Sequence, residues 1–73
     1  MIKETFAERL RKVRLIRGYT QEYMSKKINV TRSAYSYYES GKCEPDLKNL
    51  RKIAIILQIS LNYLITGEIK KSE

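Results

Sequence analysis

Two short helical segments separated by only three residues are the feature that most limits what this chain can fold into. Thr20 and Thr31 can each cap a helix, the first over residues 21–28 and the second from position 32 to position 39 or 40. Asn29, one of the few non-glycine residues that tolerate a left-handed backbone, is expected to end the first helix. A connection of this length is typical of a helix-turn-helix unit.

Cap residues of the same kind begin three further helices. We expect two of them over residues 6–17 and 61–66, and the third from residue 47 with apolar positions at helical spacing as far as residue 57. The expected caps and stops of these helices are Thr5 with a capping box to Glu8, Gly18, Asp46, Ser60 and Gly67. No long stretch alternates apolar and polar residues as a strand does. The sequence therefore predicts an all-α fold with five helices, a single domain over residues 1–67 and a short frayed tail over residues 68–73.

The positive charge of the chain is concentrated in its first part. The whole chain carries +7 at pH 7, and residues 1–42 hold ten basic and four acidic residues. This asymmetry indicates an anionic partner bound by the N-terminal elements. A solvated basic surface that only keeps the protein in solution explains the charge equally well.

The composition excludes several kinds of function. The chain has no histidine and a single cysteine, Cys43, which rules out an imidazole base, a disulfide framework and a cysteine-rich zinc site. The sequence has no glycine-rich phosphate loop and no nucleophile with a base, so we expect neither an enzyme nor a cofactor or metal. No apolar run approaches the roughly 18 residues that cross a bilayer, and the N-terminus lacks a signal peptide, so a cytoplasmic location is expected.

The stretch TQEYMSKKINVTRSAYSYYESGKCEPDL resembles the Cro and phage-repressor (XRE-type) helix-turn-helix family. The features that carry the resemblance are Gln21 after its cap, Ser25, the apolar pair Met24 and Ile28, the turn Asn29-Val30-Thr31, Glu39-x-Gly41-Lys42 and Pro45. Leu10-Arg11-x-x-Arg14 with Gly18 upstream, and Ile59-Ser60-Leu61-x-x-Leu64-Ile65-x-Gly67 downstream, also fit. The resemblance therefore covers residues 5–67.

Members of this family are five-helix DNA-binding domains and usually dimeric transcription regulators. The resemblance implies that the third helix enters the major groove and that the second helix lies across the DNA backbone. Three positions depart from the family pattern: Tyr35 replaces a usual Ile or Val, Asn29 a glycine and Ser25 an alanine. The larger ring of Tyr35 must alter the packing between the two helices or send its hydroxyl to the surface. Tyr35 and Tyr38 are both expected in the core.

In this register four residues lie on the outer face of the third helix and are the expected base contacts, namely Arg32, Ser33, Ser36 and Tyr37. Arg32 can donate two parallel hydrogen bonds to guanine, and a phosphate contact is the open alternative. Ser33 can bond a base or a phosphate, and Tyr37 can meet a thymine methyl group or a phosphate. For Ser36 a solvent-facing position without a contact is as reasonable.

Four residues are the expected phosphate contacts by the same resemblance: Gln21, Thr31, Lys42 and Arg14. Thr31 has a structural role as a cap besides this one. Arg14 and Glu39 match a family ion pair that joins the first and third helices. The structural role of this pair is its main role, and holding Arg14 toward a phosphate is a functional extension.

A symmetric dimer is expected because one recognition helix covers only a few base pairs. The fourth and fifth helices carry more apolar residues than a monomer needs to bury, and we predict a dimer contact at Ile55, Ile56, Tyr63 and Ile65. The alternative is that these residues complete a small core, which is equally reasonable for Ile56.

The residues and the resemblance together predict a sequence-specific regulator that binds double-stranded DNA. It is expected to be a dimeric repressor that reads an inverted-repeat operator through the major groove. We expect it neither to associate with a membrane nor to bind a small-molecule ligand. A restriction–modification controller of the same fold is one alternative. The others are a protein-interaction module such as an antitoxin and a non-specific basic nucleic-acid binder.

Overall fold

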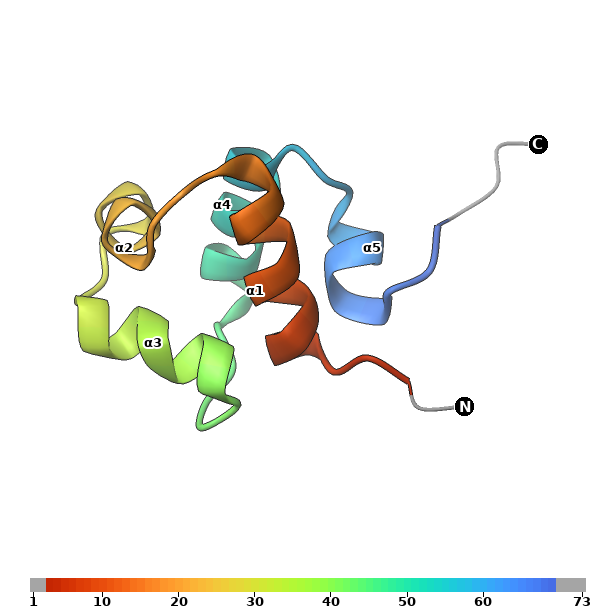
Figure 1. Ribbon diagram of the computed structural model, residues 1–73, viewed down its shortest axis with the longest axis horizontal. Coiled ribbons are helices and arrows are strands. Elements are labelled where there is room, and N and C mark those ends of the chain that lie inside the picture. Colours follow the sequence, from red (N-terminus) through yellow and green to blue (C-terminus); the bar gives the residue numbers. More distant parts are fainter. Residues whose placement is uncertain (1–2, 70–73) are drawn as a thin grey trace.

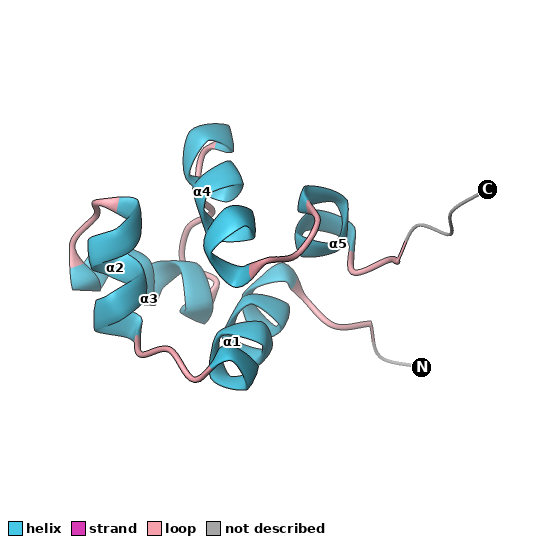
Figure 2. Cartoon of the chain, turned by 90° about the horizontal axis from the view of Figure 1, so that it is seen from above, coloured by secondary structure: helices cyan, strands magenta, loops and turns pink. Residues whose placement is uncertain are grey.

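The structure, a computed structural model, describes residues 3–69 and folds them into five helices (Figure 1). The helices are α1 (Phe6–Arg17), α2 (Gln21–Ile28), α3 (Arg32–Ser40), α4 (Leu47–Leu57) and α5 (Leu61–Thr66). Helices and loops account for all of these residues, which confirms the predicted all-α fold (Figure 2). Of the predicted tail, residues 70–73 lie outside the described part of the chain.

Each helix begins after the cap residue that the sequence predicted. The N-caps, whose side chains each accept a backbone N–H three positions on, are Thr5, Thr20, Thr31, Asp46 and Ser60. The Thr5 backbone N also donates to Glu8 Oε1 at 2.9 Å, which completes the predicted capping box. Asn29 ends α2 at a φ of 61°, as expected. Local capping therefore sets the limits of the helix-turn-helix pair α2–α3.

The end of α4 is a boundary for which the sequence analysis named no stop residue. Gln58 ends this helix at a φ of 59°, in a left-handed conformation that glutamine seldom adopts. Ile59 N donates to Ala54 O at 3.0 Å, and Arg17 Nη2 donates to Gln58 O at 3.3 Å. These two bonds offset the cost of the strained residue, and no signal in the residue type at this position predicts them.

The core lies between α3 and α5, which pack on opposite sides of α1 (Figure 1). α3 packs against α1 and α2, while α5 packs against α1 and α4. The buried apolar residues are Leu10, Val13, Met24, Ile28, Tyr35, Tyr38, Ile53, Ala54, Leu57 and Leu64. Tyr35 and Tyr38 are both among them, as the sequence predicted. This packing leaves the opposite face of α3 open to the solvent.

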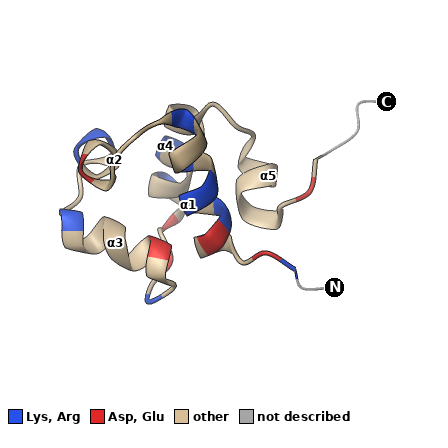
Figure 3. Ribbon diagram, viewed as in Figure 1, with Lys and Arg blue, Asp and Glu red and all other residues tan. Residues whose placement is uncertain are grey.

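Arginines of α1 fix the neighbouring helices through backbone carbonyls. Arg9, which is 3% exposed, donates to two carbonyls near the end of α5 at 3.0 and 2.9 Å. Arg17 donates to the last carbonyl of α4 at 2.7 Å, and Arg14 donates to a carbonyl of the α1–α2 loop at 2.8 Å. Three of the ten basic residues in positions 1–42 therefore serve the fold. Figure 3 colours the Lys and Arg positions of the described residues along the ribbon. The charge asymmetry of the sequence overstates the charge that an anionic partner meets.

We expect Gly67→Ala to destabilise the domain by about 1 kcal/mol or more beyond the effect of Gly18→Ala. Both glycines end helices at positive φ, 77° and 78°, so both alanines carry the left-handed cost of about 1–2 kcal/mol. At Gly67 the added carbon would lie 2.6 Å from Arg9 Nη1, whereas at Gly18 it would meet no atom within 4 Å among the described residues other than the glycine and its chain neighbours. The buried guanidinium cannot move aside without losing its hydrogen bonds. Thermal unfolding of both variants measures the difference, and equal losses would contradict this packing.

Candidate nucleic-acid interface

Polar side chains from α2 and α3 line one shallow hollow at the surface of the helix-turn-helix pair. The lining residues are Gln21, Arg32, Ser33, Ser36 and Tyr37. The first begins α2, and the other four follow the outer side of α3. The structure thus brings one predicted phosphate contact together with all four predicted base contacts. We call these five residues the α2–α3 surface.

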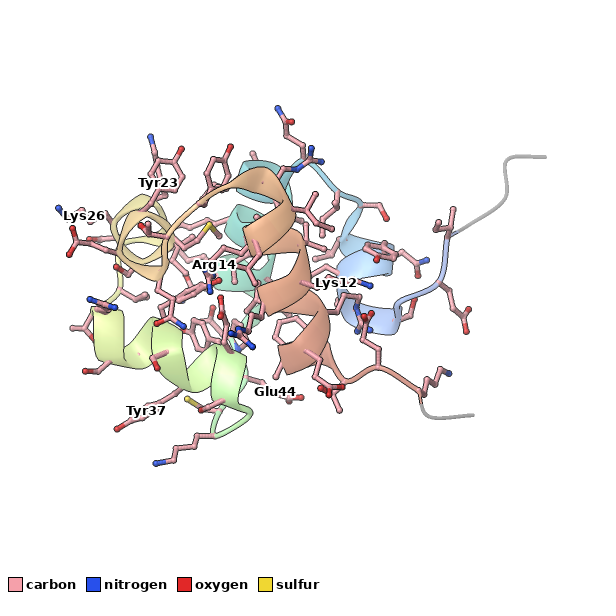
Figure 4. The ribbon with its side chains drawn as sticks, viewed as in Figure 1. Lys12, Arg14, Tyr23, Lys26, Tyr37 and Glu44 are labelled. Atoms are coloured by element: carbon pink, nitrogen blue, oxygen red, sulfur yellow. The ribbon has the colours of Figure 1, made fainter. Side chains whose placement is uncertain are left out.

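The two ends of α3 carry the predicted phosphate contacts Thr31 and Lys42. The Thr31 hydroxyl accepts the backbone N–H of Ala34 at 3.0 Å and so acts as the helix cap. Lys42 Nζ lies 5.1 Å from the centroid of the Tyr37 ring, and the Lys42 backbone N donates to Tyr37 O at 3.0 Å. Lys42 therefore places a positive charge directly beside the α2–α3 surface. Figure 4 shows Tyr37 pointing away from the body of the domain.

Glu39 connects the α2–α3 surface to the interior. Its side chain is 3% exposed and accepts two hydrogen bonds from Arg14, Nε to Oε2 at 2.6 Å and Nη2 to Oε1 at 3.0 Å. Gln21 Nε2 donates to the same Oε1 at 3.2 Å. Arg14 lies between α1 and the α2–α3 pair (Figure 4). One carboxylate therefore ties together three helices and orients Gln21 at the surface.

The surroundings of Glu39 hold the pKa of its carboxyl group below the ordinary value of 4.5. Burial by itself raises this pKa, but the hydrogen bonds from Arg14 and Gln21, together with the neighbouring Tyr35 phenol, outweigh it. The folded protein therefore binds this proton more weakly than the unfolded chain does. The stabilisation from Glu39 is complete above the unfolded pKa and is lost as the pH falls through the lowered, folded pKa.

We expect the free energy of unfolding to fall on acidification below about pH 4.5 and Glu39→Gln to reduce this dependence. The neutral amide has no ionised state to stabilise, so its contribution does not change with pH. Urea unfolding of both proteins between about pH 3 and pH 7 measures the effect. The same pH dependence in the variant and in the unmodified protein would contradict a role for this carboxylate.

The phenol of Tyr35 is buried beside the ion pair of Arg14 and Glu39. Tyr35 is fully buried, and its ring meets the ring of Tyr38 edge to face with 6.0 Å between centroids. Of the two outcomes that the sequence left open for Tyr35, the structure shows altered packing rather than a hydroxyl at the surface. Burial and the neighbouring Glu39 carboxylate raise the pKa of this phenol, so it remains a donor. Among the described residues its Oη has no hydrogen-bond partner.

The residues predicted for a dimer contact lie on separate parts of the surface. Ile55 and Ile65 are 75% and 45% exposed, whereas Ile56 and Tyr63 pack partly against the core. A hollow next to the α3–α4 loop is lined by Phe6, Glu44, Pro45, Leu50 and Ile65. A second hollow at the start of α5 is lined by Ile59, Ser60, Tyr63 and Ile69. Ile65 and Tyr63 therefore line two separate hollows, and Ile55 and Ile56 line neither.

Features of other kinds are few in the described part of the chain. None of the helices within residues 3–69 is long and apolar enough to cross a membrane. Within the same residues no three Asp, Glu or Cys side chains gather where they could hold a metal ion. Cys43 is an exposed free thiol in the loop between α3 and α4.

Two short helices joined by a three-residue turn, with polar residues along the outer face of the second, define a helix-turn-helix domain. The helix-turn-helix family matches residues 10–64, and the chain belongs to this family, in its XRE-type branch. The family comprises DNA-binding transcriptional regulators and is not an enzyme family, in agreement with the prediction.

Relatives and solved structures of this family lie close to the chain. The SPbeta prophage-derived HTH-type transcriptional regulator YonR of Bacillus subtilis (strain 168) is 47% identical over 62 residues, which are 85% of this chain and 57% of YonR. The P22 c2 repressor bound to a synthetic operator is 30% identical with a TM-score of 0.85, covering 90% of this chain and all of that one.

The restriction–modification controller protein C.AhdI of Aeromonas hydrophila is also similar. It is 32% identical with a TM-score of 0.76, covering 82% of this chain and 91% of that one. The chain spans about half the length of the curated relatives it matches.

Proposed function

We propose that this chain is a sequence-specific transcriptional regulator that binds double-stranded DNA, and that it acts as a dimeric repressor at an inverted-repeat operator. The observation that carries the proposal is the α2–α3 surface, where the start of one helix and the outer face of the next present polar groups side by side. A major groove is wide enough to admit α3, and the phosphates that border it then lie within reach of the start of α2. The likeness to the P22 c2 repressor on its operator supports this orientation.

On this proposal the residues of α3 read bases and their neighbours bind the backbone. Arg32 donates two hydrogen bonds to a guanine, while Ser33, Ser36 and Tyr37 make the adjacent contacts. Gln21, Thr31 and Lys42 donate to phosphates around the groove. Arg14 contributes its charge to a phosphate and holds Glu39, because its buried side chain is already bonded to Glu39 and the α1–α2 loop.

Selection of binding sites from randomised duplex DNA tests the proposed function directly. We expect enrichment of an inverted repeat whose half-sites are about one helical turn, roughly 34–36 Å, apart. Retention without an enriched motif would replace the proposal with a non-specific basic binder. Absence of retention at moderate salt would favour a protein-interaction module instead. The likeness to C.AhdI makes a controller of restriction–modification genes a more particular form of the same function.

For the dimer we propose that Ile65 lies at the centre of the contact. The hollow that it lines includes Glu44 and Pro45 of the loop that follows α3, so a second copy seated there lies near the end of α3. A symmetric contact holds the two α3 helices at a fixed separation, which must be about 34–36 Å for both to enter successive turns of the major groove. Ile55, Ile56 and Tyr63 do not line this hollow, so we place them outside the contact.

We expect Ile65→Glu to shift the protein toward monomer and to weaken binding to the inverted repeat more than binding to a single half-site. A carboxylate in an apolar contact must be desolvated without a partner, which opposes association. Ile55→Glu is the matched control, since Ile55 is more exposed and lies on α4 away from the hollow. Sedimentation at micromolar concentration measures the change. Equal behaviour of the two variants would move the contact elsewhere.

A further inference from the structure

The buried hydroxyl of Tyr35 is a donor without an acceptor in a domain whose other internal polar groups are well satisfied. Tyr35 and Glu39 are four residues apart on α3, so their side chains lie on the same face of the helix. Packing alone does not require the hydroxyl, because a phenylalanine ring fills the same space. A buried, unpaired hydroxyl costs stability and calls for a physical reason.

Glu39 has room for another donor. Its Oε2 accepts the Nε of Arg14 at 2.6 Å, and its Oε1 accepts both Arg14 Nη2 at 3.0 Å and Gln21 Nε2 at 3.2 Å. A carboxylate offers about four acceptor positions, so one remains after these three bonds. The Tyr35 phenol is a neutral donor on the same face of α3, and it lies close enough to the carboxylate to lower its pKa.

The bond from Gln21 is the longest of the three, and Gln21 also lines the α2–α3 surface. A phosphate that approaches this surface attracts the same amide N–H groups that now serve Glu39. If the amide turns to the phosphate, Glu39 loses a donor while a second negative charge comes near. The carboxylate then needs a replacement donor from inside the domain.

We propose that Tyr35 is a reserve hydrogen-bond donor for Glu39, which donates to this carboxylate when Gln21 turns its amide to a DNA phosphate. Tyr35 is then a positioning residue, since it acts on the DNA contact through Glu39 and never touches the DNA. This role rests on the proposed DNA-binding function. It also explains why the hydroxyl lacks a partner in the free domain, where Gln21 occupies the carboxylate.

A double-mutant cycle of Tyr35→Phe and Gln21→Ala tests this role. Alone, Tyr35→Phe should leave the melting temperature unchanged or raise it, while affinity for the selected operator falls about tenfold. In the Gln21→Ala background Glu39 has lost the donor from Gln21, so Tyr35 donates to it both in the free protein and in the DNA complex. There Tyr35→Phe should lower the melting temperature and cause no further loss of affinity. A purely structural role for Tyr35 gives the same effect in both backgrounds.

Tyr38→Phe is the matched control, because this second buried tyrosine lies one position before Glu39 and its hydroxyl accepts from Asn49 Nδ2 at 3.4 Å. It should not change operator affinity. Two results would overturn the proposal: operator affinity that is unchanged in Tyr35→Phe, or losses of affinity from Tyr35→Phe and Gln21→Ala that add fully. Either result is expected if Gln21 bonds Glu39 and a phosphate at the same time. If the unmodified protein binds no DNA, the proposed function fails. The role of Tyr35 is then decided by melting temperature alone: Tyr35→Phe should lower it in the Gln21→Ala background and not in the unmodified protein.

Discussion

Glu39→Ala is expected to lower the free energy of unfolding by about 3–5 kcal/mol, because it removes one partner of a buried ion pair. Arg14 would keep its charge in a position where its side chain is 8% exposed and would lose both of its hydrogen bonds to α3. A domain of this size has a total stability of only about 4–11 kcal/mol, so the variant approaches global unfolding. Urea unfolding at neutral pH measures the loss. DNA affinity should fall with it, because Arg14 of α1 and α3 are no longer held together.

Glu22→Ala is the control for the loss of a glutamate from an ion pair. Glu22 pairs with Lys26 at 3.6 Å, but its side chain is 61% exposed, so we expect a change below about 0.5 kcal/mol. Similar small effects at both positions would contradict the importance of the buried pair.

Replacing both Arg14 and Glu39 by methionine separates structure from function. The apolar pair should recover much of the stability, because no charge is left buried without a partner. DNA affinity should stay low, because the positive charge that Arg14 contributes to a phosphate is gone. Full recovery of affinity would show that the ion pair serves the fold alone.

The limits of most helices could be predicted because capping is a local interaction. Thr5, Thr31 and Asp46 each bond a backbone N–H three residues away, so the residue types within one turn contain the signal. The end of α4 at Gln58 could not, because a guanidinium from α1 helps to hold that turn. This hydrogen bond joins residues that are far apart in the sequence, and neither an arginine nor a glutamine at these positions predicts it.

In the candidate site, too, the features that depend on local sequence could be predicted and those that depend on distant contacts could not. The outer face of α3 follows from helical periodicity, and the structure places the four expected residues together with Gln21. The charge count was a weaker guide, since it could not separate an arginine that binds carbonyls inside the fold from one that faces a partner. The bond from Gln21 to Glu39 and the unpaired Tyr35 hydroxyl were missed. The spacing of four residues between Tyr35 and Glu39 was the available signal for the second.

Arg32→Ala is expected to reduce affinity for the selected operator about 10- to 100-fold, which corresponds to the loss of a bidentate contact with guanine. Arg32 is the first residue of α3 and lines the α2–α3 surface, and the first turn of a recognition helix reaches the base edges. The loss should be confined to operators that carry the preferred base at one position. Repeating the site selection with the variant should therefore return the same inverted repeat with that position relaxed in both half-sites.

The pattern of the loss separates a base contact from a phosphate contact at Arg32. If Arg32 binds a phosphate, its removal weakens all sequences to a similar extent and reduces the salt dependence of binding by about one phosphate contact. Lys26→Ala is the matched control for the loss of one positive charge, because Lys26 pairs with Glu22 and lies on the side of α2 away from Tyr37 (Figure 4). We expect this control to keep the selected motif and most of the affinity. A relaxed motif in Lys26→Ala as well would mean that α3 is not the element that reads the operator.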